Sequence, residues 1–344
     1  SMATTNTITI GILGLGRLGT SIGLALKRYN ARKDAQQQFT ITGFDSSSST
    51  LRQAQDLGAV DAPARSADQC ADDKDIVVLT LPYSEVQPAY RAIGDSLRSG
   101  AVVLDFSPYA LPSQGWAARH LRHETHMVGV TAIINAKYLY DGLDDTEHAA
   151  ADLFDQGALL ITAGPQGDKD AVELASDLAF LLGASAQFAD PLEHDVWASA
   201  MEGLPALVGV AAFQLLRHRQ DWSDVQRAGG AAFGRLAHHV HDTHPDDLRD
   251  LFLSNRDQLV RQIDAMSESL SVLRDLLARN DQAALEQLLI ESSDAYSDWV
   301  NRRRDVKWDD RPKPPSMSPG AQLMTGMLGG ALAKRLRGGS KGSR

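Results

Sequence analysis

Three glycines near the amino end of the chain have the spacing that a diphosphate-binding turn requires. An apolar run at 8–13 leads directly into Gly14-x-Gly16-x-x-Gly19, and a helical pattern at 16–29 follows. The first glycine permits a tight turn, the second lets backbone N–H groups approach a pyrophosphate, and the third lets the helix pack close to the strand. The helix N-terminus would present N–H donors and a partial positive charge to the phosphates. The predicted cofactor contacts in this turn are Gly14, Gly16, Arg17, Leu18 and Gly19.

An acidic residue follows the next predicted strand, at 39–44, and would select between two forms of the cofactor. Asp45 stands at the carboxyl end of that strand. Its carboxylate can accept hydrogen bonds from both hydroxyls of an adenosine ribose, and it would repel a 2′-phosphate. The run 46–50 contains no Arg or Lys that would attract such a phosphate. These residues predict NAD as the cofactor in preference to NADP. The alternative is that Asp45 is a solvated turn residue.

The glycine turn and Asp45 need a framework of strands and helices, and the first half of the chain has its pattern. Strands are predicted at 7–13, 39–44, 75–81, 101–105, 126–131, 158–162 and 185–189, and helices at 16–29, 48–57, 84–97, 113–121 and 168–183. The runs 75–81 and 101–105 are continuous apolar runs, typical of parallel strands that are buried on both faces. The alternation predicts an α/β domain with a doubly wound Rossmann sheet over residues 6–190.

From residue 191 onward the pattern changes to helices alone. They are predicted at 191–218, 222–243, 246–279 and 281–306. In the third helix one apolar row recurs every seven residues, at Phe252, Leu259, Met266 and Leu273. Such a row is typical of a coiled-coil seam. Because so long a helix needs more cover than a small bundle supplies, we expect residues 191–308 to form an all-α domain that joins two copies in a homodimer. The alternative is packing inside one helical bundle.

The last stretch, 309–344, is rich in Pro, Gly and basic residues. Its prolines predict an extended connector, and disorder is the ordinary state of such a tail. Residues 321–337 have the pattern of a short amphipathic helix, which would dock on a partner subunit or lie on a membrane.

The charge balance and the single cysteine limit the partners and the compartment. The net charge of −10 argues against a nucleic-acid or anionic-membrane surface. One cysteine, Cys70, excludes an internal disulfide and fits a reducing compartment. The longest apolar run, Gly203–Phe213, is shorter than the ~20 residues that span a bilayer, and no secretory signal is recognisable. We expect a cytoplasmic protein that acts on a small molecule, with neither a nucleic acid nor a membrane as partner.

Further motifs follow the glycine turn in an order that resembles one enzyme family. His194-Asp195 opens the helical region within the segment 193–205, and AGGAAFG at 228–234 and LFLSNR at 251–256 come next. Together with GLGRLG, these motifs make the chain similar to the prephenate and arogenate dehydrogenase family over residues 8–305. The resemblance implies an NAD-dependent oxidoreductase with a Rossmann domain and a helical dimerisation domain. The reaction that it implies is the oxidative decarboxylation of prephenate to 4-hydroxyphenylpyruvate in tyrosine biosynthesis.

The resemblance also implies roles for residues of the first domain. The family's HPxxG histidine corresponds to His126, with Met127 in place of the proline. A neutral imidazole can accept a proton as the hydride leaves, and the start of an apolar strand is expected to put it close to the cofactor crevice. The family's DxGS serine corresponds, with an offset, to Ser107 of Asp-Phe-Ser-Pro. The cofactor's ribose and nicotinamide would lie at Thr80, Leu81 and Pro82.

In the helical domain the chain keeps one family motif and departs from two others. The His194-Asp195 pair is kept, so His194 is expected to face the crevice as a catalytic residue; the alternative is a pair that packs at the helix start. Where the family has S-H-L-P-H, this chain has Glu202 for the serine, and glycine and alanine for the histidines. The family's carboxylate-binding arginine falls on an alanine or on His238, with Arg235 shortly before it. The predicted substrate contacts are Glu202, Arg235 and His238.

A carboxylate substrate needs a positively charged partner, so these departures keep other functions open. One alternative is an NAD(P)-dependent dehydrogenase or reductase of another small acid, keto or imine substrate. A second is a non-catalytic NAD-binding regulator. The cluster of His238, His241 and His244 suggests a metal site. No Cys or suitably spaced carboxylate completes its ligand set, so we predict a solvated helix end and no metal.

Overall fold

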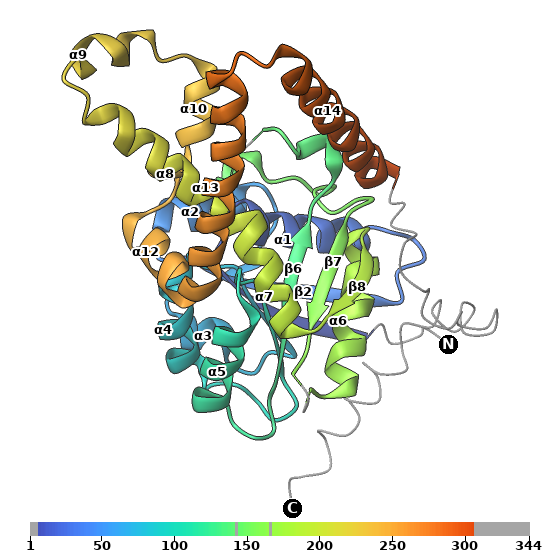
Figure 1. Cartoon of the computed structure of the whole chain (residues 1–344). Coiled ribbons are helices and arrows are strands. Elements are labelled where there is room, and N and C mark those ends of the chain that lie inside the picture. The colour runs from blue at the N-terminus through green and yellow to red at the C-terminus, as the bar shows by residue number, and fades with distance from the viewer. Residues whose placement is uncertain (1–5, 142–143, 165–166, 306–344) are drawn as a thin grey trace, which may run out of the picture. The chain divides into compact units, whose positions relative to one another are not determined.

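The computed structural model describes residues 6–141, 144–164 and 167–305, and the chain divides into two compact units (Figure 1). The first unit comprises residues 1–191 and 302–344, and the second comprises Leu192–Asn301. The first unit contains one eight-stranded sheet in the order β3-β2-β1-β4-β5-β6-β7-β8. Its strands are β1 (Asn6–Leu13), β2 (Gln37–Phe44), β3 (Ala62–Pro63), β4 (Ile76–Leu79), β5 (Val102–Asp105), β6 (His126–Ile133), β7 (Ala158–Thr162) and β8 (Ser185–Ala189).

The strands from β1 to β6 run in one direction, which confirms the prediction of a doubly wound α/β sheet. β1 pairs in parallel with β2 on one side and with β4 on the other. All residues of β4 and β5 are buried, as expected of strands covered by helices on both faces. β7 runs antiparallel to β6, and β8 is parallel to β7. Because the strand order reverses beside β1, the crevice outside the carboxyl ends of β1 and β4 is where such a sheet binds ligands.

Six α-helices connect the strands of this sheet. They are α1 (Arg17–Asn30), α2 (Ser48–Asp56), α3 (Ala67–Ala71), α4 (Tyr83–Ile93), α5 (Ala110–His120) and α6 (Lys169–Leu182). α1 buries Ile22, Leu26 and Tyr29 in the core, where the ring of Tyr29 meets that of Phe39 edge-on at 5.7 Å between centroids. Lys27 and Arg28 lie in the last turn of α1, so their positive charges complement the negative end of the helix dipole.

A long connection joins β6 to β7, and the sequence patterns assign no element to it. This β6–β7 connection, residues 134–157, contains two short 3₁₀ turns at Ala136–Tyr138 and Thr146–His148. Near its end, Leu153 and Phe154 are buried in the core of the sheet. Thr146 donates its hydroxyl to the carbonyl of Leu15 at 2.6 Å. The connection therefore lies against the turn between β1 and α1.

The described part of the second unit is helical, and two of the predicted helices are divided. Its elements, the first and last of which include residues of the first unit, are α7 (Pro191–Ala198), a π-helical turn (Ser199–Gly203), α8 (Leu204–Arg217), α9 (Trp222–Val225), a 3₁₀ turn (Gln226–Ala228), α10 (Ala231–Ala237), α11 (His239–Asp242), α12 (Pro245–Ser254), α13 (Arg256–Ala278) and α14 (Gln282–Asp305). The single helix predicted at 222–243 is wrong, because Gly229 and Gly230 adopt extended backbone angles. The one predicted at 246–279 divides at Asn255, whose φ of −132° is not helical.

The first helical stretch of the second unit is longer than its central apolar run. The stretch Pro191–Arg217 is continuous over 27 residues, with a mean hydropathy of 1.5 over its most apolar 18-residue window, of which 28% is buried. By length and composition this helix is long and apolar enough to cross a membrane. The prediction that no segment is long enough considered only Gly203–Phe213, which is part of the helix. A core helix of a helical protein meets the same requirement. Length and composition therefore assign no membrane role to this helix.

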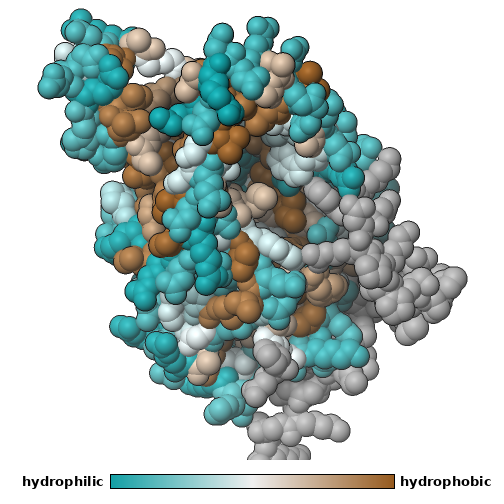
Figure 2. Space-filling model, viewed as in Figure 1, coloured by the Kyte–Doolittle hydropathy of each residue, from teal (hydrophilic) through white to brown (hydrophobic). Residues whose placement is uncertain are grey.

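Apolar side chains remain exposed on the described helices of the second unit. Figure 2 shows hydrophobic residues at the surface over α8 and α13. On α13 these include Leu270, 57% exposed, and Leu277, 65% exposed, which stand seven residues apart. Monomeric soluble proteins rarely leave large contiguous apolar patches uncovered. Leu270 and Leu277 therefore lie on a surface that the described residues of one copy leave uncovered.

Candidate dinucleotide-binding site at the carboxyl edge of the sheet

The backbone of the turn between β1 and α1 packs so closely against its neighbours that only glycine fits at two positions. Gly14 has φ +92°, and a Cβ placed on it would lie 2.4 Å from the carbonyl oxygen of Thr80. A Cβ on Gly19 would lie 2.0 Å from the carbonyl oxygen of Gly14. Thr80, directly after β4, donates its hydroxyl to that same carbonyl at 2.7 Å. The end of β4 therefore supports the turn from behind, and neither glycine can carry a side chain without moving backbone.

The predicted ribose ligand, Asp45, follows β2 and is fixed beside the turn. Its Oδ2 accepts the backbone N–H of Leu15 at 2.8 Å, and its Oδ1 accepts that of Ser47 at 2.9 Å. Each carboxylate oxygen has more than one lone pair, so both can still accept hydroxyl groups. The side chain of Ser47 caps α2 by accepting the N–H of Thr50 at 3.3 Å. Asp45 is thus an oriented acceptor of the turn and not a solvated residue at its margin.

The amino end of α1 is the position for a diphosphate, and a backbone carbonyl of the β6–β7 connection contacts it. Gly16 precedes the helix in an extended conformation, and no acidic residue lies in the first turn. The N–H of Arg17 donates to the carbonyl oxygen of Asp144 at 2.8 Å. A Cβ on Gly16 would be 3.4 Å from the same oxygen. A protein oxygen therefore stands where a helix N-terminus of this type holds a phosphate oxygen.

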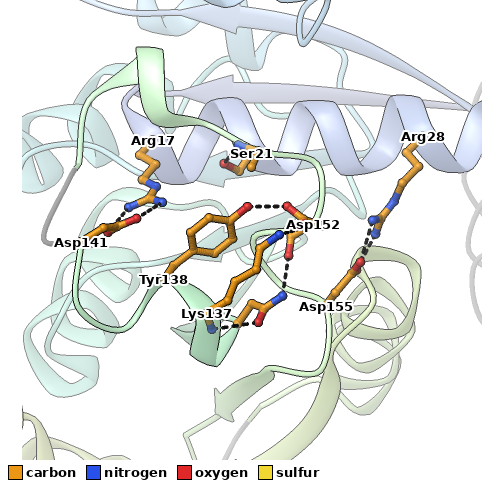
Figure 3. Close-up of polar contacts among 10 residues, drawn as sticks. Arg17, Ser21, Arg28, Lys137, Tyr138, Asp141, Asp152 and Asp155 are labelled. Carbon is orange, nitrogen blue, oxygen red and sulfur yellow. Dashed lines mark hydrogen bonds and ion pairs between the residues drawn. The ribbon is translucent and has the colours of Figure 1, made fainter. Parts of the chain in front are cut away.

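The side chain of Arg17 has a carboxylate partner in the same connection (Figure 3). Its two terminal nitrogens donate to the two oxygens of Asp141 at 2.7 and 2.8 Å. These hydrogen bonds raise the pKa of Arg17 above its ordinary value, against the opposing effect of burial. The guanidinium also lies over the ring of Tyr138, 4.9 Å from its centroid. Sequence reasoning missed Asp141, because its chain position does not indicate that it faces α1.

The turn, tested as a whole, fits a dinucleotide. Gly14 supplies the left-handed angle and Gly19 the close packing of helix and strand, while Gly16 adds no side chain beside the Asp144 carbonyl. Asp45 supplies the acceptor for a ribose. Of the other predicted contacts, Leu18 lies in the first turn of α1, while Leu81 and Pro82 follow Thr80 at the carboxyl end of β4.

A buried carboxyl group ends the neighbouring strand β5 and orients Ser107. Asp105 accepts the phenol hydroxyl of Tyr90 at 2.7 Å and the backbone N–H of Ser107 at 2.8 Å, and it also accepts the Ser107 hydroxyl. Burial raises the pKa of Asp105 and raises that of Tyr90 well above its usual range. Asp105 pairs in register with Leu79 of β4. Ser107 therefore lies at the same edge of the sheet as Thr80 and the glycine turn.

His126 lies at the other edge of the sheet. It is the first residue of β6 and pairs in register with Val102, the first residue of β5. Because β5 and β6 are parallel, this position is at the amino ends of the strands, whereas the crevice lies outside their carboxyl ends. Its Nδ1 is 3.9 Å from a carboxylate oxygen of Asp168, just before α6. The expectation that a strand start would bring His126 close to the cofactor is wrong.

The other predicted residues belong to the second unit. His194 and Asp195 are buried in α7, with His194 Nδ1 2.9 Å from the Asp195 carboxylate. Glu202 is exposed in the π-helical turn, and Arg235 is exposed on α10. His238 Nδ1 lies 3.0 Å from a carboxylate oxygen of Asp242.

The histidine cluster around α11 has the arrangement of a polar helix surface. The rings of His238 and His239 lie 3.9 Å apart. Burial and the neighbouring His238 lower the pKa of His239. Among the residues with described positions, no three His, Cys, Asp or Glu side chains are grouped to hold a metal ion.

Comparisons with known proteins match both parts of the chain. Residues 9–109 match the family model "NADP oxidoreductase coenzyme F420-dependent", and residues 190–291 match "Prephenate dehydrogenase, dimerization domain". A prephenate dehydrogenase of Bacillus subtilis (strain 168) is 25% identical over 310 residues, which are 86% of this chain and 77% of that protein.

Solved structures share the fold. The prephenate dehydrogenase from A. aeolicus in complex with hydroxyphenyl propionate and NAD+ aligns with a TM-score of 0.71 at 21% identity, over 87% of this chain and 99% of that chain. The Synechocystis arogenate dehydrogenase aligns with a TM-score of 0.63 at 18% identity, over 85% of this chain and 100% of that chain. The resemblance inferred from the motifs is confirmed by these matches.

Gly19→Ala tests whether the turn binds a nucleotide. The added methyl group would meet the Gly14 carbonyl oxygen, so it must displace the turn. We expect the affinity for NADH, measured by fluorescence titration, to fall at least about tenfold, equivalent to about 1.4 kcal/mol. Gly115→Ala is the matched control, because it lies in α5 with nothing near its added Cβ. Equal NADH affinity for Gly19→Ala and the unmodified chain would contradict the assignment.

Proposed function

We propose, proceeding from the confirmed resemblance to the prephenate and arogenate dehydrogenase family, that this chain is an NAD-dependent dehydrogenase of the prephenate type. The reaction is the oxidative decarboxylation of prephenate to 4-hydroxyphenylpyruvate, a step of tyrosine biosynthesis. One combination carries the proposal: a glycine turn backed by Asp45 precedes, in the same chain, a region that matches the prephenate dehydrogenase dimerization domain.

In this proposal the first unit binds and orients the cofactor. NAD, when bound, supplies the acceptor for the hydride. The N–H groups at the amino end of α1 hold its diphosphate in place of the Asp144 carbonyl that now accepts the Arg17 N–H. Asp45 holds the adenosine ribose, because its two bonds to Leu15 and Ser47 fix the carboxylate in place. The same negative charge disfavours a 2′-phosphate, so we propose NAD in preference to NADP.

We propose separate roles for two side chains: Ser107 contacts the substrate, and His194 alone accepts the proton of its ring hydroxyl. Ser107 donates its own proton to the buried Asp105, so its oxygen is left to accept a hydrogen bond from a substrate. His194 takes up the hydroxyl proton, because the adjacent Asp195 carboxylate would stabilise the imidazolium that forms. His126 is not part of this proposal, since it begins β6 at the amino edge.

A second candidate function has a specific observation in its favour. Glu202 and Arg235 are exposed, and Glu202 puts a negative charge where the family motif has a serine. A dicarboxylate needs paired positive groups, and a carboxylate at this place disfavours it. The alternative substrate is another small acid, keto or imine compound, oxidised or reduced with the same cofactor. The non-catalytic regulator differs from both, because it would bind NAD without turnover.

We propose that the chain forms a homodimer through its helical unit. The matched region is a dimerization domain, and two leucines of α13, Leu270 and Leu277, are exposed in one copy. The predicted seam row, by contrast, is buried or half-buried within the copy: Phe252, Leu259, Met266 and Leu273. A second copy would cover Leu270 and Leu277 with the same surface. We also propose a cytoplasmic location. The single cysteine, Cys70, is a free buried thiol, which fits a reducing compartment.

Turnover tests the reaction and the residue roles together. The unmodified chain is expected to form NADH from NAD and prephenate or arogenate. Ser107→Ala is expected to lower kcat roughly a hundredfold, as loss of a single preorganised hydrogen bond does. His194→Asn is expected to lower kcat by about 10²-fold or more, as loss of a general base does. His126→Asn is the control that leaves kcat unchanged.

Three results would contradict these assignments in different ways. A loss of turnover in His126→Asn alone would restore that residue and overturn the placement at the carboxyl edge. No NADH from either ring compound, with turnover of another small acid, keto or imine compound, would favour the second candidate. No turnover with any compound, in a chain that binds NADH, would favour the regulator.

Leu270→Asp tests the homodimer. A buried, unpaired charge in an apolar interface is costly, so this variant is expected to sediment as a monomer where the unmodified chain sediments as a dimer. Leu57→Asp in the first unit, at a residue 43% exposed, is the control and should remain dimeric. A dimer that survives Leu270→Asp would exclude this surface from the interface.

A further inference from the structure

The ion pair between Arg17 and Asp141 lies beside the helix end to which the proposed function assigns the cofactor's diphosphate. Arg17 is the first residue of α1 and follows Gly16 directly. Its guanidinium makes the bidentate contact with Asp141 at 2.7 and 2.8 Å, and its side chain is only 6% exposed. Its backbone N–H donates to the Asp144 carbonyl. The guanidinium and the backbone N–H of Arg17 could each donate to a phosphate, and each donates to a protein oxygen in this structure.

The chemistry of these partners resembles that of a phosphate. Arg forms parallel two-point hydrogen bonds to carboxylates and to phosphates in the same geometry. The positive end of a helix dipole favours a negative group of either kind. Asp141 is 30% exposed, so it lies at the outer side of the ion pair. A carboxylate bound here satisfies Arg17 in the absence of a nucleotide.

Several contacts hold the β6–β7 connection in place for this ion pair (Figure 3). Tyr138 lies under the Arg17 guanidinium and donates its hydroxyl to Asp152 at 2.6 Å. Further along, the N–H of Ala150 donates to the hydroxyl of Ser21 on α1 at 3.0 Å. Because these contacts do not involve Asp141, they would remain if its charge were removed.

The Arg17–Asp141 ion pair could either fasten the β6–β7 connection to α1 or act on the phosphate position. A second ion pair between α1 and the same connection distinguishes these two roles. Arg28 of α1 makes a bidentate contact with Asp155 at 2.7 and 2.8 Å. These side chains are 39% and 36% exposed, and Arg28 lies about 16 Å along the helix from Arg17. If such pairs only fasten the connection to α1, the two should act alike. If Asp141 acts on the phosphate position, only the first should affect a nucleotide.

We propose that Asp141 is an internal competitor for the cofactor's diphosphate, and that binding of the cofactor exchanges the Asp141 carboxylate for phosphate oxygens on Arg17. This inference rests on the proposed NAD-dependent function. Asp141 thereby sets the cofactor affinity, because only the fraction of molecules with Arg17 released is competent to bind. Loss of the charge at residue 141 removes the competitor and tightens binding.

Asp141→Asn and Asp155→Asn are compared with the unmodified chain of residues 1–344. Affinities for NADH and for ADP-ribose are measured by calorimetric titration at constant salt. We expect Asp141→Asn to bind both ligands on the order of tenfold more tightly. Asp155→Asn should bind them as the unmodified chain does. ADP-ribose carries the diphosphate without the nicotinamide, so an equal gain for both ligands places the effect at the diphosphate.

Arg17→Gln, alone and combined with Asp141→Asn, completes the test. Competition for Arg17 predicts that Asp141→Asn gives no gain once Arg17 is absent. The same gain in the Arg17→Gln background would show general charge repulsion and would overturn the proposal. Unchanged or weaker binding by Asp141→Asn, or an equal gain from Asp155→Asn, would also overturn it.

The proposed function and this inference fail in different ways. If neither the unmodified chain nor Asp141→Asn binds NADH, the cofactor assignment fails and the inference fails with it. If both bind NADH with equal affinity, the inference alone is wrong. If Asp141→Asn binds more tightly but no ring compound is turned over, the inference is supported and the dehydrogenase proposal is not.

Discussion

A backbone contact that excludes side chains determines the arrangement at the carboxyl edge of the sheet. The turn after β1 packs on the end of β4 so closely that a methyl group on Gly14 or Gly19 would meet a carbonyl oxygen. This packing aims the amino end of α1 across the edge of the sheet, and the Leu15 N–H of the same turn fixes Asp45. The turn therefore positions both groups that would bind the nucleotide: the amino end of α1 for an anion and the Asp45 carboxylate for hydroxyl groups.

The β6–β7 connection adds a second constraint to that edge. Its core residue Phe154 is buried in the sheet, so the connection is part of the fold and not an appendage. From that anchor it brings the Asp144 carbonyl and the Asp141 carboxylate to α1. The site therefore has its own negative partner for Arg17. The affinity for the cofactor then depends on the difference in free energy between the Arg17–phosphate contact and the Arg17–Asp141 contact. Removing the charge of Asp141 changes that difference.

Local pattern was enough to predict the strands of the sheet except the two-residue β3, whereas the position of the site residues depends on strand direction and long-range contacts. Glycine spacing and continuous apolar runs are local signals, and they predicted β1, β4, β5 and the turn. The start of a strand at His126 was also predicted, but the edge at which it lies follows from parallel pairing with β5. Asp141 faces Arg17 across 124 residues of sequence, and no spacing rule indicates such a contact. In the helical unit, the apolar periodicity predicted one helix at 222–243. That helix is interrupted because Gly229 and Gly230 adopt extended backbone angles.

A crystal structure of this chain grown with NAD decides where the nucleotide binds. We expect the diphosphate at the amino end of α1 beside Gly16, with the adenosine ribose hydroxyls within hydrogen-bonding distance of Asp45. We also expect phosphate oxygens in place of Asp141 on Arg17. NAD bound elsewhere, or a turn without nucleotide in crystals grown at saturating NAD, would show that the glycine turn is not the cofactor site.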